Sequence, residues 1–201
     1  MLFCMTISGL MAQNVEDVLG VNQLKFNGTK YRLAWSAHNK TQYMQEYCPK
    51  GQLPESFIDM FTISVHDTQA MTPHMAVMAK EQELKDRKEK KKDVWNWAVF
   101  HNPDETEWII DFVCCSSRNG ELEIVEFDIH RYRMIEVNGH LALQLLMYSH
   151  RAYGEDITDF MKEGLAKLRK EAIEEMIKWD VKCKVQTNKD RKSTRLNSSH
   201  T

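Results

Sequence analysis

Alternating apolar and polar positions run through the middle of the chain, over residues 95–147. Apolar side chains recur at every second position in residues 108–112 and again in residues 125–129. A period of two places such side chains on one face of a β-strand. Arg118-Asn119-Gly120 and Asn138-Gly139 interrupt the pattern, and Asn-Gly pairs favour the tight turns of β-hairpins. We therefore predict an antiparallel sheet as the organising element of the fold.

The same alternation predicts strands outside this stretch. An Asn27-Gly28 pair divides residues 23–31 into the two halves of a hairpin near the start of the chain. Arg131 and Arg133 fall on the apolar face of their strand, so we expect a β-bulge between Ile129 and Ile135 that corrects the pattern. The predicted sheet has about seven strands. After the hairpin, the expected strands lie over residues 41–47, 60–66, 94–101, 108–116, 121–137 and 140–151.

Helical spacing appears in two longer segments. The stronger one begins at Asp156, and its apolar stripe predicts a long C-terminal helix packed on the sheet. The stripe consists of Ile157, Met161, Leu165, Leu168, Ala172, Met176 and Trp179. Thr72-Pro73 predicts the start of a second helix, and Leu53-Pro54 that of a short third one. The fold class is therefore α+β, an antiparallel sheet with a long C-terminal helix and one or two shorter helices packed on it.

Charged residues crowd the far half of the second predicted helix, from Lys80 to Asp93. Two interpretations are open. The stretch is either a basic docking arm or a solvated helix end held by ion pairs between Glu81 and Lys85 and between Asp86 and Lys90. We favour the solvated helix, because acidic residues alternate with the basic ones.

Both ends of the chain differ from the middle. Residues 1–12 are apolar and uncharged, and resemble the end of a secretory signal peptide whose cleavage after Ala12 leaves Gln13 first. A buried N-terminal strand or helix is the alternative. Residues 190–200 are what a common sequencing-library adapter encodes when it is read in frame, so we exclude them from the fold. We expect a single domain over residues 13–185, a disordered, adapter-derived tail over residues 186–201, and a periplasmic or secreted location.

Composition fits one soluble domain, with 42% hydrophobic and 28% charged residues among 201. The formal net charge is -2, and it becomes -4 when the three basic residues and one acidic residue of 190–200 are left out. A mildly acidic chain argues against nucleic acid as a partner. We expect no transmembrane segment in the mature chain and no cofactor or metal.

Four cysteines remain after the predicted signal peptide, namely Cys48, Cys114, Cys115 and Cys183. An even number permits disulfides in an exported protein, although a chain with a full core does not need them. The spacing contains no Cys-x-x-Cys pair that would indicate zinc or redox chemistry. We interpret the cysteines first as small apolar side chains.

Two short segments carry a resemblance to known sequences. Residues 47–52 (Tyr-Cys-Pro-Lys-Gly-Gln) lead to Asp59-Met60, and residues 125–128 (Val-Glu-Phe-Asp) lead to Arg131-Tyr132. This combination resembles uncharacterised small exported proteins of Gram-negative bacteria. The resemblance implies a bacterial, exported protein and assigns no active residue.

Glu126, Asp128 and His130 alternate along one predicted strand, so their side chains share a face. Such a row suits acid–base catalysis or a metal, but polar residues at every second position are also typical of a solvent-exposed sheet face. Nearby arginines form a second group, Arg131, Arg133 and Arg151. If the two strands pair and the arginines have no acidic neighbours, the arginines can bind an anion. The alternative is that they form ion pairs with acidic residues across the sheet.

Neither group dictates a function. We expect an exported, non-catalytic binding or interaction domain whose ligand is an unknown protein or small molecule. The alternative is a small hydrolase or metal-dependent enzyme that uses the strand face of Glu126, Asp128 and His130. The sequence leaves open whether the protein is an enzyme, because it nominates no nucleophile and no third ligand beside that row.

Overall fold

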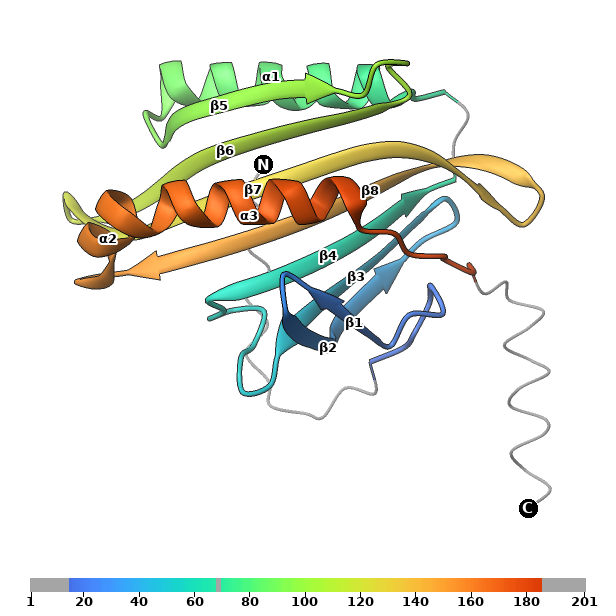
Figure 1. Cartoon of the computed structure of the whole chain (residues 1–201), viewed down its shortest axis with the longest axis horizontal. Helices are drawn as coiled ribbons and strands as arrows, with labels where there is room; N and C mark the ends of the chain where they lie inside the picture. The colour runs from blue at the N-terminus through green and yellow to red at the C-terminus, as the bar shows by residue number, and fades with distance from the viewer. Residues whose placement is uncertain (1–14, 68–69, 186–201) are drawn as a thin grey trace.

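A single antiparallel sheet dominates the computed structural model, which describes residues 15–67 and 70–185. Its order is β1-β2-β3-β4-β8-β7-β6-β5 (Figure 1). The first four strands follow one another, the chain then crosses to the far edge, and the last four return until β8 pairs with β4. The strands are β1 (Gln23–Phe26), β2 (Thr29–His38), β3 (Gln42–Pro49), β4 (Asp59–His66), β5 (Val94–His101), β6 (Glu107–Arg118), β7 (Glu121–Val137) and β8 (His140–Tyr153).

The α+β class is confirmed, with eight strands in place of about seven. The hairpin predicted at Asn27-Gly28 is present and consists of β1 and β2. Asn27, Asn119 and Asn138 have φ values of 44°, 53° and 51°, and the glycine after each also has a positive φ. Two successive left-handed residues make the tight hairpin turn for which Asn-Gly is favoured.

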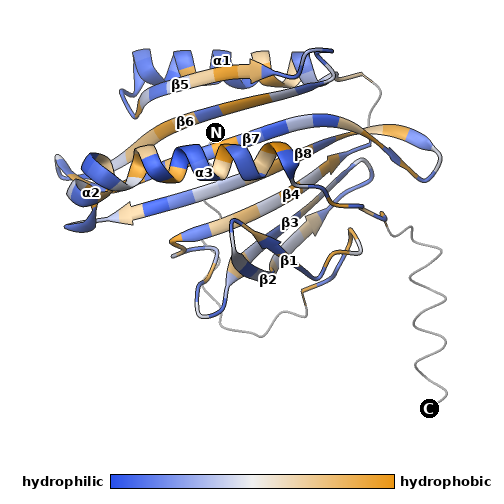
Figure 2. Cartoon of the chain, in the orientation of Figure 1, coloured by the Kyte–Doolittle hydropathy of each residue, from blue (hydrophilic) through white to orange (hydrophobic). Residues whose placement is uncertain are grey.

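Helices cover both faces of the sheet. Helix α1 (Pro73–Lys90) contacts β5, β6 and β7 on one face. On the other face lie α2 (Asp156–Asp159), a π-helical turn η1 (Phe160–Gly164) and α3 (Leu165–Lys178), which run across β7 and β8 (Figure 1). Apolar and polar segments alternate along α3 and along the strands (Figure 2). The sheet therefore separates two hydrophobic cores, one under α1 and one under α3.

The C-terminal helix spans 23 residues, as its apolar stripe predicts, but it is not uniform. The π-helical turn at Phe160–Gly164 interrupts it after one turn. A Cβ atom added at Gly164 would lie 3.1 Å from the Phe160 ring, so glycine lets the turn close over that buried side chain. After α3 the chain runs beside the start of the protein, where the Lys184 amide donates to the carbonyl oxygen of Leu19 at 2.8 Å.

Helix α1 begins as predicted. Thr72 is its N-cap and accepts a hydrogen bond from the Met75 amide at 3.2 Å, and Pro73 follows. The ion pairs expected in its charged half are present, at 3.1 Å between Lys85 and Glu81 and at 3.0 Å between Lys90 and Asp86. Leu84 is fully buried and anchors this half on the sheet. These contacts favour the solvated helix over a free docking arm.

Two local predictions are wrong. Strand β7 keeps an unbroken register with β6 and β8 from Ile129 to Arg133, so the expected bulge is absent there. The register shift between β6 and β7 lies instead at Ser116 and Ser117. The expected short helix after Leu53 is a series of turns, because the Gln52 side chain accepts hydrogen bonds from the amides of Ile58 and Asp59 and holds an open loop.

The four described cysteines are all free. No helix within the described residues is long and apolar enough to cross a membrane. The signal peptide expected over residues 1–12 and the tail expected over residues 186–201 lie outside the described residues.

Candidate functional sites on the two faces of the sheet

Strand β7 carries five of the six predicted site residues and divides them between the two faces. Tyr132 belongs to the core under α1 and Ile129 to the core under α3. Because side chains alternate along an unbroken strand, Glu126, Asp128 and His130 share the α1 face. Arg131 and Arg133 therefore share the α3 face.

Asp128 is buried among polar groups on the α1 face, with 4% of its surface exposed. It accepts hydrogen bonds from the Ser149 hydroxyl at 2.5 Å and from the Cys114 thiol at 3.8 Å. Glu126 forms a short ion pair with Arg151 on β8. One donor atom each from Cys114, Glu126 and Asp128 lie within 4.8 Å of one another. The sheet register thus assembles a compact polar cluster from three strands.

The surroundings of Asp128 change how readily it ionises. Burial, and then the negative charge of Glu126, raise the pKa of Asp128 well above its usual range, although the Ser149 hydrogen bond opposes this. Arg151 supplies the positive charge that faces Glu126. The raised pKa favours the neutral form of Asp128, and this acid lies beside a Glu126 side chain that is paired with Arg151.

His130 lies apart from this pair. Its Nδ1 is 3.4 Å from the Tyr132 hydroxyl, and its ring meets the Phe112 ring edge-on at 5.1 Å. Burial, and then the nearby positive charge of Lys80, hold the pKa of His130 well below its usual range. Among the described residues, no hydrogen bond joins His130 to Glu126 or Asp128. Glu126, Asp128 and His130 share a face, as expected, but only Glu126 and Asp128 belong to the polar cluster.

A thiolate and two carboxylates form a donor set that binds divalent cations such as zinc. Each of these donors already faces a cationic or polar partner. Arg151 holds Glu126, the Arg87 side chain donates to Cys114, and Ser149 donates to Asp128. Two guanidinium groups at the cluster disfavour a further cation by charge repulsion. The cluster is best described as a closed hydrogen-bond network.

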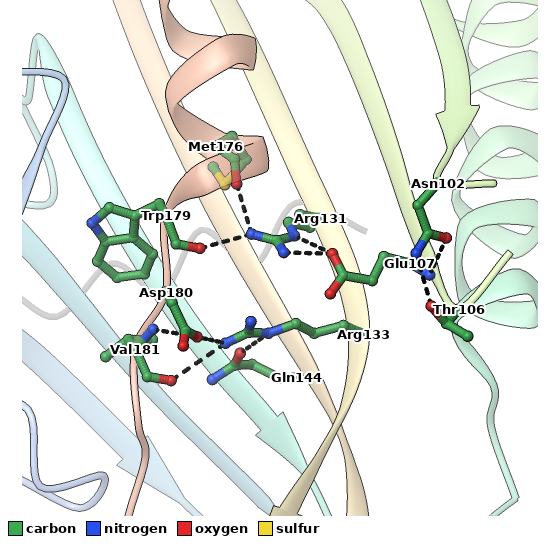
Figure 3. Close-up of polar contacts among 10 residues, drawn as sticks. All are labelled: Asn102, Thr106, Glu107, Arg131, Arg133, Gln144, Met176, Trp179, Asp180 and Val181. Carbon is green, nitrogen blue, oxygen red and sulfur yellow. Dashed lines mark hydrogen bonds and ion pairs between the residues drawn. The ribbon is translucent and has the colours of Figure 1, made fainter. Parts of the chain in front are cut away.

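Arg131 is a structural residue of the α3 face, 5% exposed. Its Nη1 donates to the carbonyl oxygens of Met176 and Trp179, both at 2.7 Å, where α3 ends (Figure 3). Its other nitrogens bind Glu107 at the start of β6. A helix C-terminus leaves carbonyl oxygens without partners, and a cation there is favourable. Arg131 therefore fastens the end of α3 to the sheet.

Arg133 lies beside Arg131, but one nitrogen of its guanidinium has no acceptor among the described residues. Its Nε donates to Gln144 at 2.7 Å, and its Nη2 donates to Asp180 at 2.5 Å and to the Val181 carbonyl oxygen at 3.3 Å (Figure 3). Its side chain is only 12% exposed. No acceptor within residues 15–67 or 70–185 binds its Nη1. Arg133 thus retains an unused donor in a largely buried guanidinium.

The three predicted anion-binding arginines do not converge. Arg151 lies on the α1 face, where it binds Glu126 and covers the Phe57 ring at 3.9 Å from its centre. Arg131 is fully engaged in holding α3. Arg133 alone lines an open depression.

This depression has a volume of about 390 Å³ and lies where three segments meet. Helix α1 begins on one side, the β5–β6 loop forms another, and β7 continues past the end of its pairing with β6 at Glu107. Its lining residues are Thr72, Pro73, His74, Glu105, Thr106, Glu107, Arg133 and Met134. The Asn102 side chain holds the loop by donating to Thr106 at 2.8 Å and accepting from the Glu107 amide at 3.0 Å (Figure 3).

Comparison with known proteins identifies the family to which the chain belongs. The model of an uncharacterised protein family matches residues 19–181. This chain belongs to that family. The matched range includes all eight strands and all the helices, so the polar cluster and the depression both lie within the family domain. No curated protein matches the chain.

Sequence patterns could not reveal the depression in this family member. They correctly indicate a helix start at Thr72-Pro73 and a turn at Asn102-Pro103, but nothing in the sequence brings these two together. The sequence likewise gives Cys114 only the role of a small apolar side chain, because its proximity to Asp128 depends on the register between β6 and β7. The one available signal is that Cys114 and Cys115 must face opposite sides of one strand.

Proposed function

We propose that this protein is an exported, non-catalytic binding domain, and that the depression beside Arg133 binds a small molecule with an acidic group. The observation that carries this proposal is the depression itself, which Arg133 and the exposed His74 both line at the start of α1. Side chains that donate hydrogen bonds beside a helix start favour a bound anion.

The surroundings of Arg133 support an anion. The first turn of α1 opens at Pro73, and the dipole of a helix N-terminus favours negative charge. His74, exposed on that turn, adds a further donor. The Glu107 carboxylate does not oppose a ligand strongly, since Arg131 binds it.

The size and stiffness of the depression favour a small ligand. Its volume of about 390 Å³ lies in the range of small-molecule sites. The hydrogen bonds of Asn102 fix the loop wall, and the Trp108 indole donates to the Glu105 carbonyl oxygen at 3.0 Å. A preformed site loses less conformational freedom when it binds. Thr72 and Thr106 supply hydroxyl groups, and Met134 supplies an apolar contact.

A ligand screen tests this proposal. The folded protein is melted with a panel of small carboxylates and phosphates, and a ligand specific for the folded state raises the melting temperature. The His74→Ala variant should lose most of that rise. Met75→Ala is the matched control, because Met75 is the next residue, is 52% exposed and does not line the depression. Equal rises in both variants, or no rise with any anion, would contradict the proposed site.

Export is a separate part of the proposal and rests on the sequence of residues 1–13 alone. An apolar segment followed by an Ala-Gln junction and a polar stretch suits signal-peptide cleavage. Expression of the complete gene in a Gram-negative host, followed by N-terminal sequencing, is the test. A periplasmic product that begins at Gln13 supports export. A cytosolic product that keeps the initiator methionine contradicts it.

Glu126 and Asp128 support the second candidate, a small hydrolase or metal-dependent enzyme. Two adjacent carboxyl groups, one of which has a raised pKa, are a pairing that acid–base catalysis can use. Burial of Asp128 and the absence of any described contact to His130 rank this candidate second. Hydrolase assays on the wild type and on Asp128→Asn distinguish the two: activity that vanishes in a folded Asp128→Asn protein would replace the binding proposal.

A further inference from the structure

Side chains of both charge signs line the depression at the start of α1. They are His74, Glu105, Glu107 and Arg133. Arg133 and Glu107 each have a charged partner within the fold. His74 and Glu105 are exposed, and neither side chain makes an ion pair or a hydrogen bond among the described residues. The depression therefore offers one available carboxylate beside one available imidazole.

The Trp108 side chain holds both of these groups in place. The centre of its ring lies 4.6 Å from the centre of the His74 ring, and its indole nitrogen donates to the Glu105 carbonyl oxygen at 3.0 Å. Trp108 is buried and belongs to the core under α1. One fixed ring therefore positions His74 on the helix wall of the depression and Glu105 on the loop wall.

Glu105 has a backbone conformation that is costly for its residue type. Its φ is 55°, in the left-handed region that glycine and asparagine adopt far more readily than glutamate. The Glu105 amide donates to the Asn102 carbonyl oxygen at 3.0 Å, so the turn closes in spite of this cost. A turn with no other role favours glycine at such a position, whereas strained residues cluster at binding sites. The strain thus points to a role for the Glu105 side chain.

An imidazole and two carboxylates are also potential ligands of a metal ion. Three donor atoms of this kind come within 4.8 Å of one another at a single place among the described residues, at Cys114, Glu126 and Asp128. The depression does not bring its own donors that close together, so its charged groups fit a metal ion poorly. Separated groups of opposite charge suit a larger ligand that carries two charges of its own.

We infer that the ligand of the depression is a zwitterion, an amino acid whose carboxylate lies at the start of α1 and whose ammonium group meets Glu105. The inference rests on the proposed function, since it takes the same depression and the same acidic group. The Glu105 carboxylate repels a simple anion, but it attracts a ligand that also carries an ammonium group. His74 and the helix dipole favour the acid, and Pro73 and Met134 offer apolar contact to the rest of the ligand.

Pairs of ligands that differ only in the amine test the inference. Phenylalanine is compared with 3-phenylpropionate, and 2-aminobutyrate with butyrate, by titration calorimetry on the wild type. We expect each amino acid to bind about tenfold more tightly than its partner, since the ammonium group gains a charge-assisted hydrogen bond. The Glu105→Gln variant should lose this preference and still bind the acids. Asp104→Asn is the matched control, because Asp104 is the preceding residue, is exposed and does not line the depression.

The outcomes separate this inference from the proposed function. A preference that disappears in Glu105→Gln and persists in Asp104→Asn supports the zwitterion. Acids that bind equally well with and without the amine overturn the zwitterion and leave the anion site in place. So does a preference for the amine that survives in Glu105→Gln. If none of these acids binds the wild type, the depression is not an anion site, and the proposed function falls together with the inference.

Discussion

Asp128 shows how burial controls the chemistry of one residue. In the unfolded chain an aspartate has a pKa of about 3.9, whereas burial and Glu126 raise the folded pKa well above that value. Below the unfolded pKa both states carry the proton and Asp128 costs nothing. Between the unfolded and the folded pKa only the unfolded state gives up the proton, so the stability of the fold falls as the pH rises through this window, and the loss is complete above the folded pKa.

The Asp128→Asn variant should remove this pH dependence. An amide resembles the neutral carboxylic acid, and its oxygen still accepts from Ser149, so the variant should equal or exceed the wild type in stability at alkaline pH. Urea unfolding at a series of pH values is the measurement. Asp111→Asn is the contrast, because the equally buried Asp111 binds Arg169 at 2.9 and 2.7 Å, and losing that pair should cost about 1–2 kcal/mol. A steeper pH dependence in Asp128→Asn would contradict the assignment.

Arg131 gives a second prediction for a single residue. Replacement by methionine keeps the apolar stem but removes both carbonyl contacts at the end of α3 and leaves Glu107 without its partner. We expect the free energy of unfolding to fall by about 2–4 kcal/mol. The double variant Arg131→Met/Glu107→Gln should lose less stability than the sum of the losses in the two single variants. Additive losses would mean that the two side chains do not act as a pair.

The alternation of polar residues correctly places Glu126, Asp128 and His130 on one face, because strand periodicity is a local property. It does not predict that α1 lies on the same face, and burial decides which side chains become neutral. Arg131 illustrates the same limit. Its position on an apolar face suggests a bulge. In the structure its guanidinium instead donates to carbonyl oxygens of residues 45 and 48 positions later in the chain, which the local pattern does not predict.

At the scale of elements, α3 offers a matched pair of neighbours. Met176 is fully buried against the sheet, whereas Ile177 is 53% exposed. Met176→Ala should lower the free energy of unfolding by about 2–5 kcal/mol, since it leaves a cavity under the helix. Ile177→Ala should change it by less than about 0.5 kcal/mol. Urea melts of the two variants are the measurement, and similar losses would mean that this face of α3 is not docked.

Hairpins and helix starts are the elements that sequence predicts best, because Asn-Gly turns and the Thr72 cap with Pro73 are determined by neighbouring residues. The helix stripe likewise locates the C-terminal helix from Asp156 to Lys178. The π-helical turn inside it is not predictable in this way. It depends on the space between Gly164 and the Phe160 ring, which exists only after the helix has packed.

At the scale of the whole molecule, one sheet serves two cores. Strands β6, β7 and β8 each contribute alternate side chains to the core under α1 and to the core under α3. Loss of either helix would expose one face of these strands and weaken the support for the other. We therefore expect the two cores to unfold together, as a single cooperative unit.

Paired variants in opposite cores test this cooperativity. Leu84→Ala, under α1, and Met176→Ala, under α3, should each lower the midpoint of one shared unfolding transition, by about 2–5 kcal/mol in free energy. Circular dichroism and tryptophan fluorescence should give coincident curves in both variants. The two side chains lie in separate clusters, so the double variant should show the sum of the single losses. Two resolved transitions, with Leu84→Ala shifting only one of them, would show that α1 and its core unfold independently of the rest of the sheet.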